Sequence, residues 1–285
     1  MSKLVFGNLP SAEEIERRAA ERHENGKASV NEPGRFIATS LGAWLKRAQD
    51  SGISSVNAVR IADVPRKALM EIEEQSPEHE VIWNNLVKAK NSIEDGHMVR
   101  WDACSHSELK WVMGESGKTK DQRIEAGRDT YPCMRVYELH YEYPADIIPV
   151  WSRPWIDALE VDGFPVEFRV FVRDSKVIGV ASYYPQRALP STPEIYGFAS
   201  RCKEMATQLV KHLDESCERP WLDAFAAKFN PELVNATMDF LVSSSGDVLF
   251  LEAGPPFGAG AHPCAFIDCE ISGVALELAP GVILR

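Results

Sequence analysis

The order of apolar and polar positions predicts two hairpins in the second half of the chain. Residues 164–186 alternate like two strands that turn at Asp174-Ser175. Residues 235–256 form a second apolar pair around the polar turn Ser243–Gly246. Between these hairpins, residues 193–216 have apolar positions at helical spacing and predict a long amphipathic helix.

The first 95 residues have mostly helical patterns. Ser11 followed by Glu14 is the start of a capping box. Further helices are expected at residues 42–52, at 63–75 with Asp63 and Pro65 near the start, and at 77–93. In the last of these, Val81, Leu86 and Ile93 are expected near one face.

A change of pattern at residues 94–98 marks the expected domain boundary, between a mostly helical region (1–95) and a second region (96–285). There we expect short strands at 97–104, 132–144 and 146–155, a helix at 105–113 and a polar stretch at 114–130. Hairpins mixed with single helices predict an α+β class rather than a doubly wound parallel sheet.

Composition narrows the function classes. A net charge of -11 with no basic block makes non-specific nucleic-acid binding unlikely. No apolar run reaches the roughly 18 residues of a membrane span, and the N-terminus lacks the apolar core of a signal peptide, so we expect a cytoplasmic protein with no membrane partner. The six scattered cysteines are expected to be free thiols. His262, Cys264 and Cys269 are too irregularly spaced to indicate zinc.

Two carboxylates in the second hairpin have no opposite charge nearby in the sequence. A two-residue turn at Ser245-Gly246 places Asp239 opposite Glu252, and Leu241 opposite Phe250. Opposed side chains have Cβ atoms about 4.5–5.5 Å apart, so the acids would repel unless a divalent cation takes both as ligands. On that interpretation, neutralising either acid leaves the ligand-free fold as stable or slightly more so. The alternative is a wet face, where each acid accepts a nearby Arg or Lys.

Arg169 is held on the first hairpin. It shares a face with Glu167 and Phe171, while Phe168, Val170 and Val172 share the more apolar face. A guanidinium fixed on a strand suits phosphate or carboxylate. A structural Glu167–Arg169 pair is the alternative.

The segment "GESGKT" fails the P-loop pattern, because Val112 stands where its first glycine is needed. It is interpreted as a surface loop, or as a glycine loop that carries Lys118 and Lys120 toward phosphates.

Together these segments resemble the ATP-grasp superfamily. They are most similar to its branch related to the eukaryotic cell-division-cycle chaperone that assembles a translation initiation factor, and to phage and bacterial proteins of uncharacterised function. The resemblance rests on "RPW" (153–155), "EFRVFVRDSKVIGVASYY" (167–184), the following helix, "ATMDF" and "GDVLFLEAGPPFG". It covers roughly residues 145–265 and implies two α+β lobes that clasp a nucleotide, with a helical N-terminal region in front.

The resemblance implies the residue roles. ATP would be bound with Mg²⁺ held by Asp239 and Glu252, and Arg169 would contact phosphates as the catalytic residue. A strand at Val150, Trp151, Ser152 and Arg153 would be the hinge that holds adenine. Arg100 would stand where the family has a phosphate-binding Lys.

The implied activity is that of a ligase, which joins a carboxylate to an amine through an acyl phosphate. One departure favours another class: Gly254 stands where the family's last metal motif has Asn. An ATP-binding chaperone for a protein partner, without turnover, is therefore the alternative. A plain binding module without nucleotide is the third.

Overall fold

The protein is described from a computed structural model, in which residues 11–69, 79–103, 118–128, 143–183, 189–190, 192–221, 229–256 and 282–283 are placed. Its helices and strands are α1 (Ala12–Val30), β1 (Arg35–Ile37), α2 (Leu41–Asp50), β2 (Val59–Pro65), α4 (His79–Asn91), β3 (His97–Trp101), α6 (Lys120–Gly127), β4 (Ile147–Pro154), β5 (Glu160–Val161), β6 (Phe164–Pro165), β7 (Glu167–Arg173), β8 (Lys176–Ser182), α8 (Pro193–Glu215), β9 (Arg219–Trp221), β10 (Ala236–Val242), β11 (Val248–Gly254) and β12 (Val282–Ile283).

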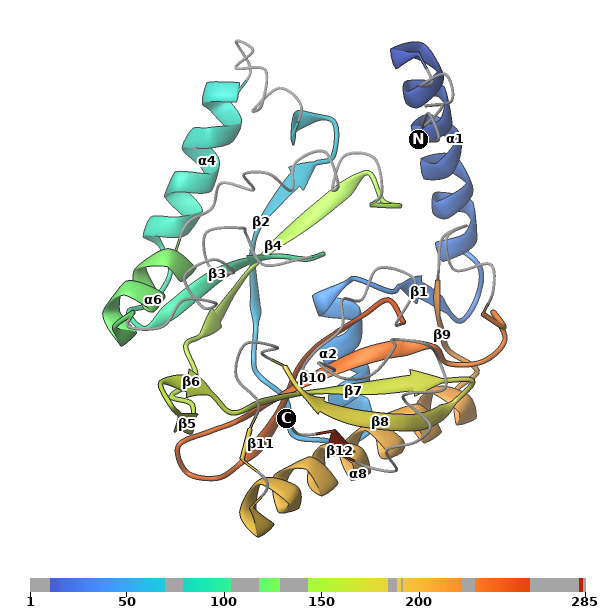
Figure 1. The fold of residues 1–285 in the computed structure, drawn as a ribbon. Coiled ribbons are helices and arrows are strands. Elements are labelled where there is room, and N and C mark those ends of the chain that lie inside the picture. Colours follow the sequence, from blue (N-terminus) through green and yellow to red (C-terminus); the bar gives the residue numbers. More distant parts are fainter. Residues whose placement is uncertain are drawn as a thin grey trace, which may run out of the picture.

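Two mixed helix-and-sheet layers face each other (Figure 1). A three-stranded sheet has the order β2-β4-β3, and a five-stranded sheet has the order β11-β10-β7-β8-β12. Helix α4 lies on the three-stranded sheet, and α8 lies along the five-stranded one (Figure 1). The α+β class predicted from the sequence is confirmed.

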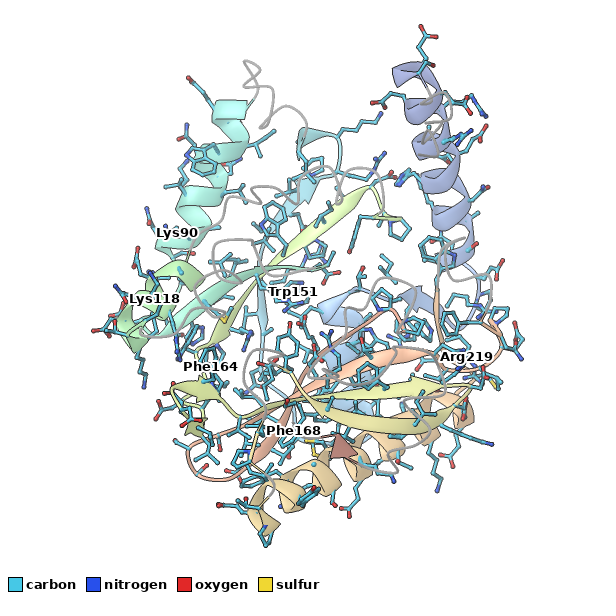
Figure 2. The ribbon with its side chains drawn as sticks, in the orientation of Figure 1. Lys90, Lys118, Trp151, Phe164, Phe168 and Arg219 are labelled. Atoms are coloured by element: carbon cyan, nitrogen blue, oxygen red, sulfur yellow. The ribbon has the colours of Figure 1, made fainter. Side chains whose placement is uncertain are left out.

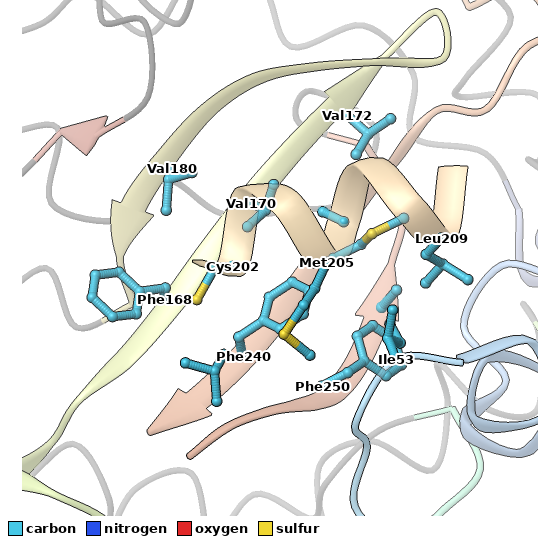
Figure 3. Close-up of a cluster of buried hydrophobic side chains, with 14 of the residues drawn as sticks. Ile53, Phe168, Val170, Val172, Val180, Cys202, Met205, Leu209, Phe240 and Phe250 are labelled. Carbon is cyan, nitrogen blue, oxygen red and sulfur yellow. The ribbon is translucent and has the colours of Figure 1, made fainter. Parts of the chain in front are cut away.

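The five-stranded sheet is built on the apolar face of the first hairpin. Phe168, Val170 and Val172 share the buried face, as predicted, and pack with α8, Phe240 and Phe250 (Figure 3). The buried residues of α8 recur at three- and four-residue spacing, and Thr192 caps its N-terminus through the Ile195 amide. The predicted turn is also confirmed, since Asp174 and Ser175 have φ of 49° and 59° and Arg173 pairs with Lys176.

The three-stranded sheet has its own core. Val64, Val99, Ile148 and Val150 face α4 and pack against Leu86. Val81, expected near the same face of α4 as Leu86 and Ile93, is 64% exposed whereas those two are buried, so this part of the prediction is wrong. The opposite face of the three-stranded sheet is turned toward the five-stranded sheet (Figure 1).

Two other expectations are corrected. The helix expected from Asp63 is preceded by a missed strand, because Val59–Pro65 pairs with β4. The polar stretch after Gly117 contains a helix, Lys120–Gly127, with a complete capping box between Thr119 and Gln122.

The expected boundary at 94–98 has sheet partners on both sides of it. Strand β2 before it and strand β3 after it both flank β4. Strand β1 pairs in parallel with β9, and Trp44 of α2 lies in the core of the five-stranded sheet. The division into regions 1–95 and 96–285 stays a prediction.

Several predictions fall on residues outside the described ranges: the helix at 105–113, most of the strand at 132–144, and the His262–Cys269 group. Cys202 and Cys217 are free thiols, as expected. No helix in the described part of the chain has the length and apolarity to cross a membrane.

Candidate functional site

The hairpin of β10 and β11 places two acids opposite each other, as predicted, but its turn and its strand register differ from the predicted ones. Its loop has three residues rather than two, because the Ser243 amide donates to the Asp247 carbonyl and Gly246 takes φ of 86°. Leu241 therefore pairs with Leu249, not with Phe250. A bulge after Asp239 then shifts the register back by one residue, and Asp239 lies opposite Glu252 as expected.

Asp239 has a second neighbour on its other side. It lies opposite Arg169 of β7, and the guanidinium donates two hydrogen bonds to the carboxylate, each of 2.7 Å. Both residues are buried, at 3% and 7% exposure, and the guanidinium also lies 4.7 Å from the centre of the Tyr183 ring. This is a bidentate, charge-assisted pair that fixes the position of both groups.

Glu252 has an arginine partner from the other sheet. Arg100 of β3, which is 4% exposed, contacts the Glu252 carboxylate. The two sheets are thus joined at this point by an ion pair. The site contains two guanidinium groups and two carboxylates, whose formal charges add to zero.

The expectation that the two acids lack opposite charges is therefore wrong. Each acid has an arginine that is distant in sequence, and Asp239 lies in a buried pair rather than on a wet face. The expected effect on stability is reversed as well. Neutralising Asp239 would leave a buried guanidinium without its counter-ion, which is costly.

The donor set fits a divalent cation that comes with phosphate. Mg²⁺ is commonly held by one or two carboxylates and completes its shell with phosphate oxygens and water. Asp239 and Glu252 are opposed and offer such oxygens. In the described part of the chain, no cluster of three or more His, Cys, Asp or Glu side chains could hold a metal without such help.

The four residues expected at the hinge divide between two faces of β4. Val150 and Ser152 are buried on the α4 side, and Ser152 accepts or donates a hydrogen bond of 3.1 Å with His97. Trp151 and Arg153 are partly exposed on the side of Arg100, which lies directly opposite Trp151. In Figure 2 Trp151 lies between the two sheets.

Sequence reasoning missed Asp102, which adjoins this group. Its side chain is 1% exposed and accepts hydrogen bonds from Trp151 Nε1 (2.7 Å), Tyr143 Oη (2.6 Å) and the Gly42 amide (3.1 Å). One signal was available: Asp102 is two residues after Arg100 and so continues the same face of the strand.

Gly254 leaves room where the resemblance expects a metal ligand. It lies opposite Thr237, on the same face as Glu252 and Asp239. Among the described residues, a Cβ atom added there would meet only Thr237 Oγ1 within 4 Å, at 3.8 Å, which is ordinary contact. The backbone therefore accepts a side chain at this position.

Comparisons with known proteins return the two kinds of protein that the motifs resemble. No family model matches the chain, and no curated protein does. Among solved structures, Cdc123 from Schizosaccharomyces pombe is similar over 81% of this chain and 85% of its own, with 13% identity and a TM-score of 0.45. The ATP-grasp ligase PsnB is similar over 84% and 56%, with 12% identity and a TM-score of 0.33.

A third similar structure is the VanG D-Ala:D-Ser ligase from Enterococcus faecalis, which matches 80% of this chain and 55% of its own, with 14% identity and a TM-score of 0.37. The chain thus spans most of the length of Cdc123 and about half the length of these two ligases.

Proposed function

We propose that the protein binds ATP with Mg²⁺ between its two sheets and uses it to join a carboxylate to an amine. One observation carries the proposal: Arg169, Asp239, Glu252 and Arg100 form a continuous row that crosses from one sheet to the other. The sequence motifs that contain Arg169, Asp239 and Glu252 resemble those of ATP-grasp proteins in order and spacing, and Arg100 stands outside those motifs, where the family has a Lys.

The row suits a metal–triphosphate because its partners can exchange. Arg169 and Arg100 can turn their donors from the carboxylates to phosphate oxygens, which a planar guanidinium binds in the same forked geometry. Asp239 and Glu252 are then released as ligands for Mg²⁺. Each buried charge keeps an opposite charge throughout, so the exchange avoids leaving an unpaired ion.

In the proposed reaction a substrate carboxylate oxygen takes the γ-phosphoryl group, giving an acyl phosphate and ADP. An amine nitrogen then attacks the acyl carbon, phosphate leaves with the bonding electrons, and the amine loses a proton. Arg169 would hold the transferring group and offset its negative charge. Bound Mg²⁺ would supply neutralisation of phosphate charge, while the chain itself contributes orientation.

Binding is tested by calorimetry and thermal melting with ATP, GTP and EDTA. Mg²⁺-ATP should raise the melting temperature, because a ligand of the folded state stabilises it by mass action. Arg169→Lys should lower the affinity at least tenfold. Arg47→Lys is the matched control, since Arg47 is also a buried arginine paired with an acid, Glu218 at 2.6 Å, but lies away from the row. The absence of any nucleotide-dependent shift at millimolar ATP would exclude the proposal.

Turnover is tested separately with pools of amino acids, peptides and polyamines, by phosphate release and mass spectrometry. The ligase predicts ADP and phosphate release that depends on both a carboxylate and an amine. A specific observation favours the second candidate, an ATP-binding assembly factor for a protein partner. Gly254 supplies no side-chain ligand. One Mg²⁺ can still bind and complete its shell with water, but two-metal turnover needs more ligands than this site offers. Tight ATP binding with no turnover in any pool would select that candidate. A cytoplasmic location remains a prediction for both.

A further inference from the structure

A buried carboxylate, whose donors among the described residues are all uncharged, lies beside the row. The hydrogen bonds to the Asp102 side chain come from an indole N–H, a phenol and a backbone amide. The Asp102 backbone amide donates to the Pro149 carbonyl, and its carbonyl accepts from the Leu41 amide. Burial, and then the charge and hydrogen bond of Asp102, raise the pKa of Tyr143 well above its usual range, so the phenol stays a donor. Burying a carboxylate costs free energy that these bonds offset.

The arrangement fixes one side chain that is not itself buried. The indole of Trp151 packs on the first turn of α2, where a Cβ atom at Gly42 would lie 2.4 Å from Trp151 Cζ2. Asp102 holds the Nε1 end of the same ring at 2.7 Å. The ring is therefore held at two points, while the residue keeps a partly exposed surface.

The Trp151 ring lies between two arginines, a residue type suited to binding phosphate. Arg60 of β2 and Arg100 of β3 are both opposite Trp151, one on each neighbouring strand. Opposed Cβ atoms are about 4.5–5.5 Å apart, so a ligand that lies on the indole is within reach of a guanidinium. The backbone of Val150–Ser152 already has strand partners on both sides, which leaves the side chain as the available contact.

We propose that Asp102 is a positioning residue, which holds the Trp151 indole as a stacking platform for the base of the bound nucleotide. This rests on the proposed nucleotide binding and adds how the base is recognised. Stacking on an aromatic ring tolerates any base, because every base has a π-face. The platform therefore distinguishes nucleotides from inorganic polyphosphate rather than one purine from another.

The test compares Mg²⁺-ATP with Mg²⁺-tripolyphosphate by calorimetry. Trp151→Leu should weaken ATP binding about tenfold or more and leave tripolyphosphate binding unchanged, because only the base contacts the ring. Trp151→Phe keeps a π-face but loses the N–H that Asp102 holds, so it should recover only part of the loss; it also serves if the Leu variant does not fold. Equal losses for both ligands, or no loss for ATP, would overturn the platform.

The positioning role is tested at Asp102 with the same two ligands. Asp102→Ala should weaken ATP binding and not tripolyphosphate binding, because the indole loses its anchor. Asp102→Asn should restore the ratio of the two affinities, because its amide oxygen can still accept from Trp151 Nε1 while its NH₂ donates to the Tyr143 oxygen. An Asn variant as defective as the Ala variant would overturn the role. If the wild type binds tripolyphosphate as tightly as ATP, the stacking platform is wrong but the proposed function is not. If the wild type binds neither ligand, both the platform and the proposed function are wrong.

Discussion

Asp239 and Arg169 illustrate how one side chain can serve stability and binding in turn. Their pair is almost completely buried, and each atom pair is 2.7 Å apart. A buried ion pair contributes little net stability as a pair, but removing one partner is costly because the other charge stays in a low-dielectric site.

Asp239→Asn is therefore expected to lower the free energy of unfolding of the ligand-free protein by about 3 kcal/mol. Urea denaturation of wild type and variant measures the difference. Asp157→Asn is the control, because Asp157 is 65% exposed beside Lys120 and its loss should not be measurable. An unchanged midpoint for the Asp239 variant would contradict the buried pair.

Gly254 is a position where a single side chain should change metal binding. Gly254→Asn is expected to fold normally, because the nearest atom of the described residues to an added Cβ is Thr237 Oγ1 at 3.8 Å. Its amide oxygen would add a ligand beside Glu252 and raise the Mg²⁺-ATP affinity several-fold. Gly254→Ala adds the Cβ without the oxygen and should leave that affinity as in wild type. Titrations in which the Asn and Ala variants behave alike would disprove the expectation.

Among the elements, the β10–β11 hairpin sets which residues lie opposite each other at the site, through the length of its loop and the position of its bulge. The three-residue loop requires a left-handed residue at Gly246, and the bulge after Asp239 returns the acids to opposed positions. A register error of one residue would have placed them on opposite faces.

Two Gly→Ala substitutions should change stability in opposite directions. Gly246→Ala should destabilise by about 1 kcal/mol or more, because an L side chain is strained at φ of 86° even though an added Cβ would make only ordinary contact with Phe198 Cε1, at 4.0 Å, among the described residues. Gly197→Ala should stabilise by about 0.5–1 kcal/mol, because Gly197 is in the exposed part of α8 and no atom of the described residues would lie within 4 Å of an added Cβ. Thermal melts of both variants measure the two changes. A stabilised Gly246→Ala variant would contradict the left-handed residue in the hairpin loop, and a destabilised Gly197→Ala variant would contradict the expectation for α8.

At the scale of the molecule, the Arg100–Glu252 contact joins the three-stranded sheet to the five-stranded one. Both metal-ligand candidates are bonded to arginine, Glu252 across the sheets and Asp239 within one. Binding of metal and of nucleotide should therefore depend on each other.

Mg²⁺ alone at about 10 mM is expected to leave the melting temperature unchanged, whereas Mg²⁺ with ATP should raise it. The carboxylates become available only when phosphate takes their arginines. Differential scanning calorimetry with Mg²⁺, ATP in EDTA, and both together tests the coupling. A shift with Mg²⁺ alone, as large as that with Mg²⁺-ATP, would refute it.

The sequence by itself determined the elements whose signals are local. Alternation predicted β7 and β8, two apolar runs around a polar turn predicted β10 and β11, helical spacing predicted α8, and the capping residue Ser11 predicted the start of α1. It also determined which face of β7 is apolar, because strand side chains alternate. Local signals misled at β2, where Asp63 and Pro65 have the chemistry of a helix start but lie in a strand paired with β4.

Only the tertiary structure decided what surrounds the acids. Sequence distance hid both counter-ions, since Arg169 is 70 residues from Asp239 and Arg100 reaches Glu252 from the other sheet. It also hid Asp102, whose partners Gly42, Tyr143 and Trp151 come from three separate segments. The hydrophobic pattern shows which side of an element is buried. A charged side chain pairs with the groups that the fold brings within hydrogen-bond distance, and those groups are determined by the packing between elements rather than by any single element.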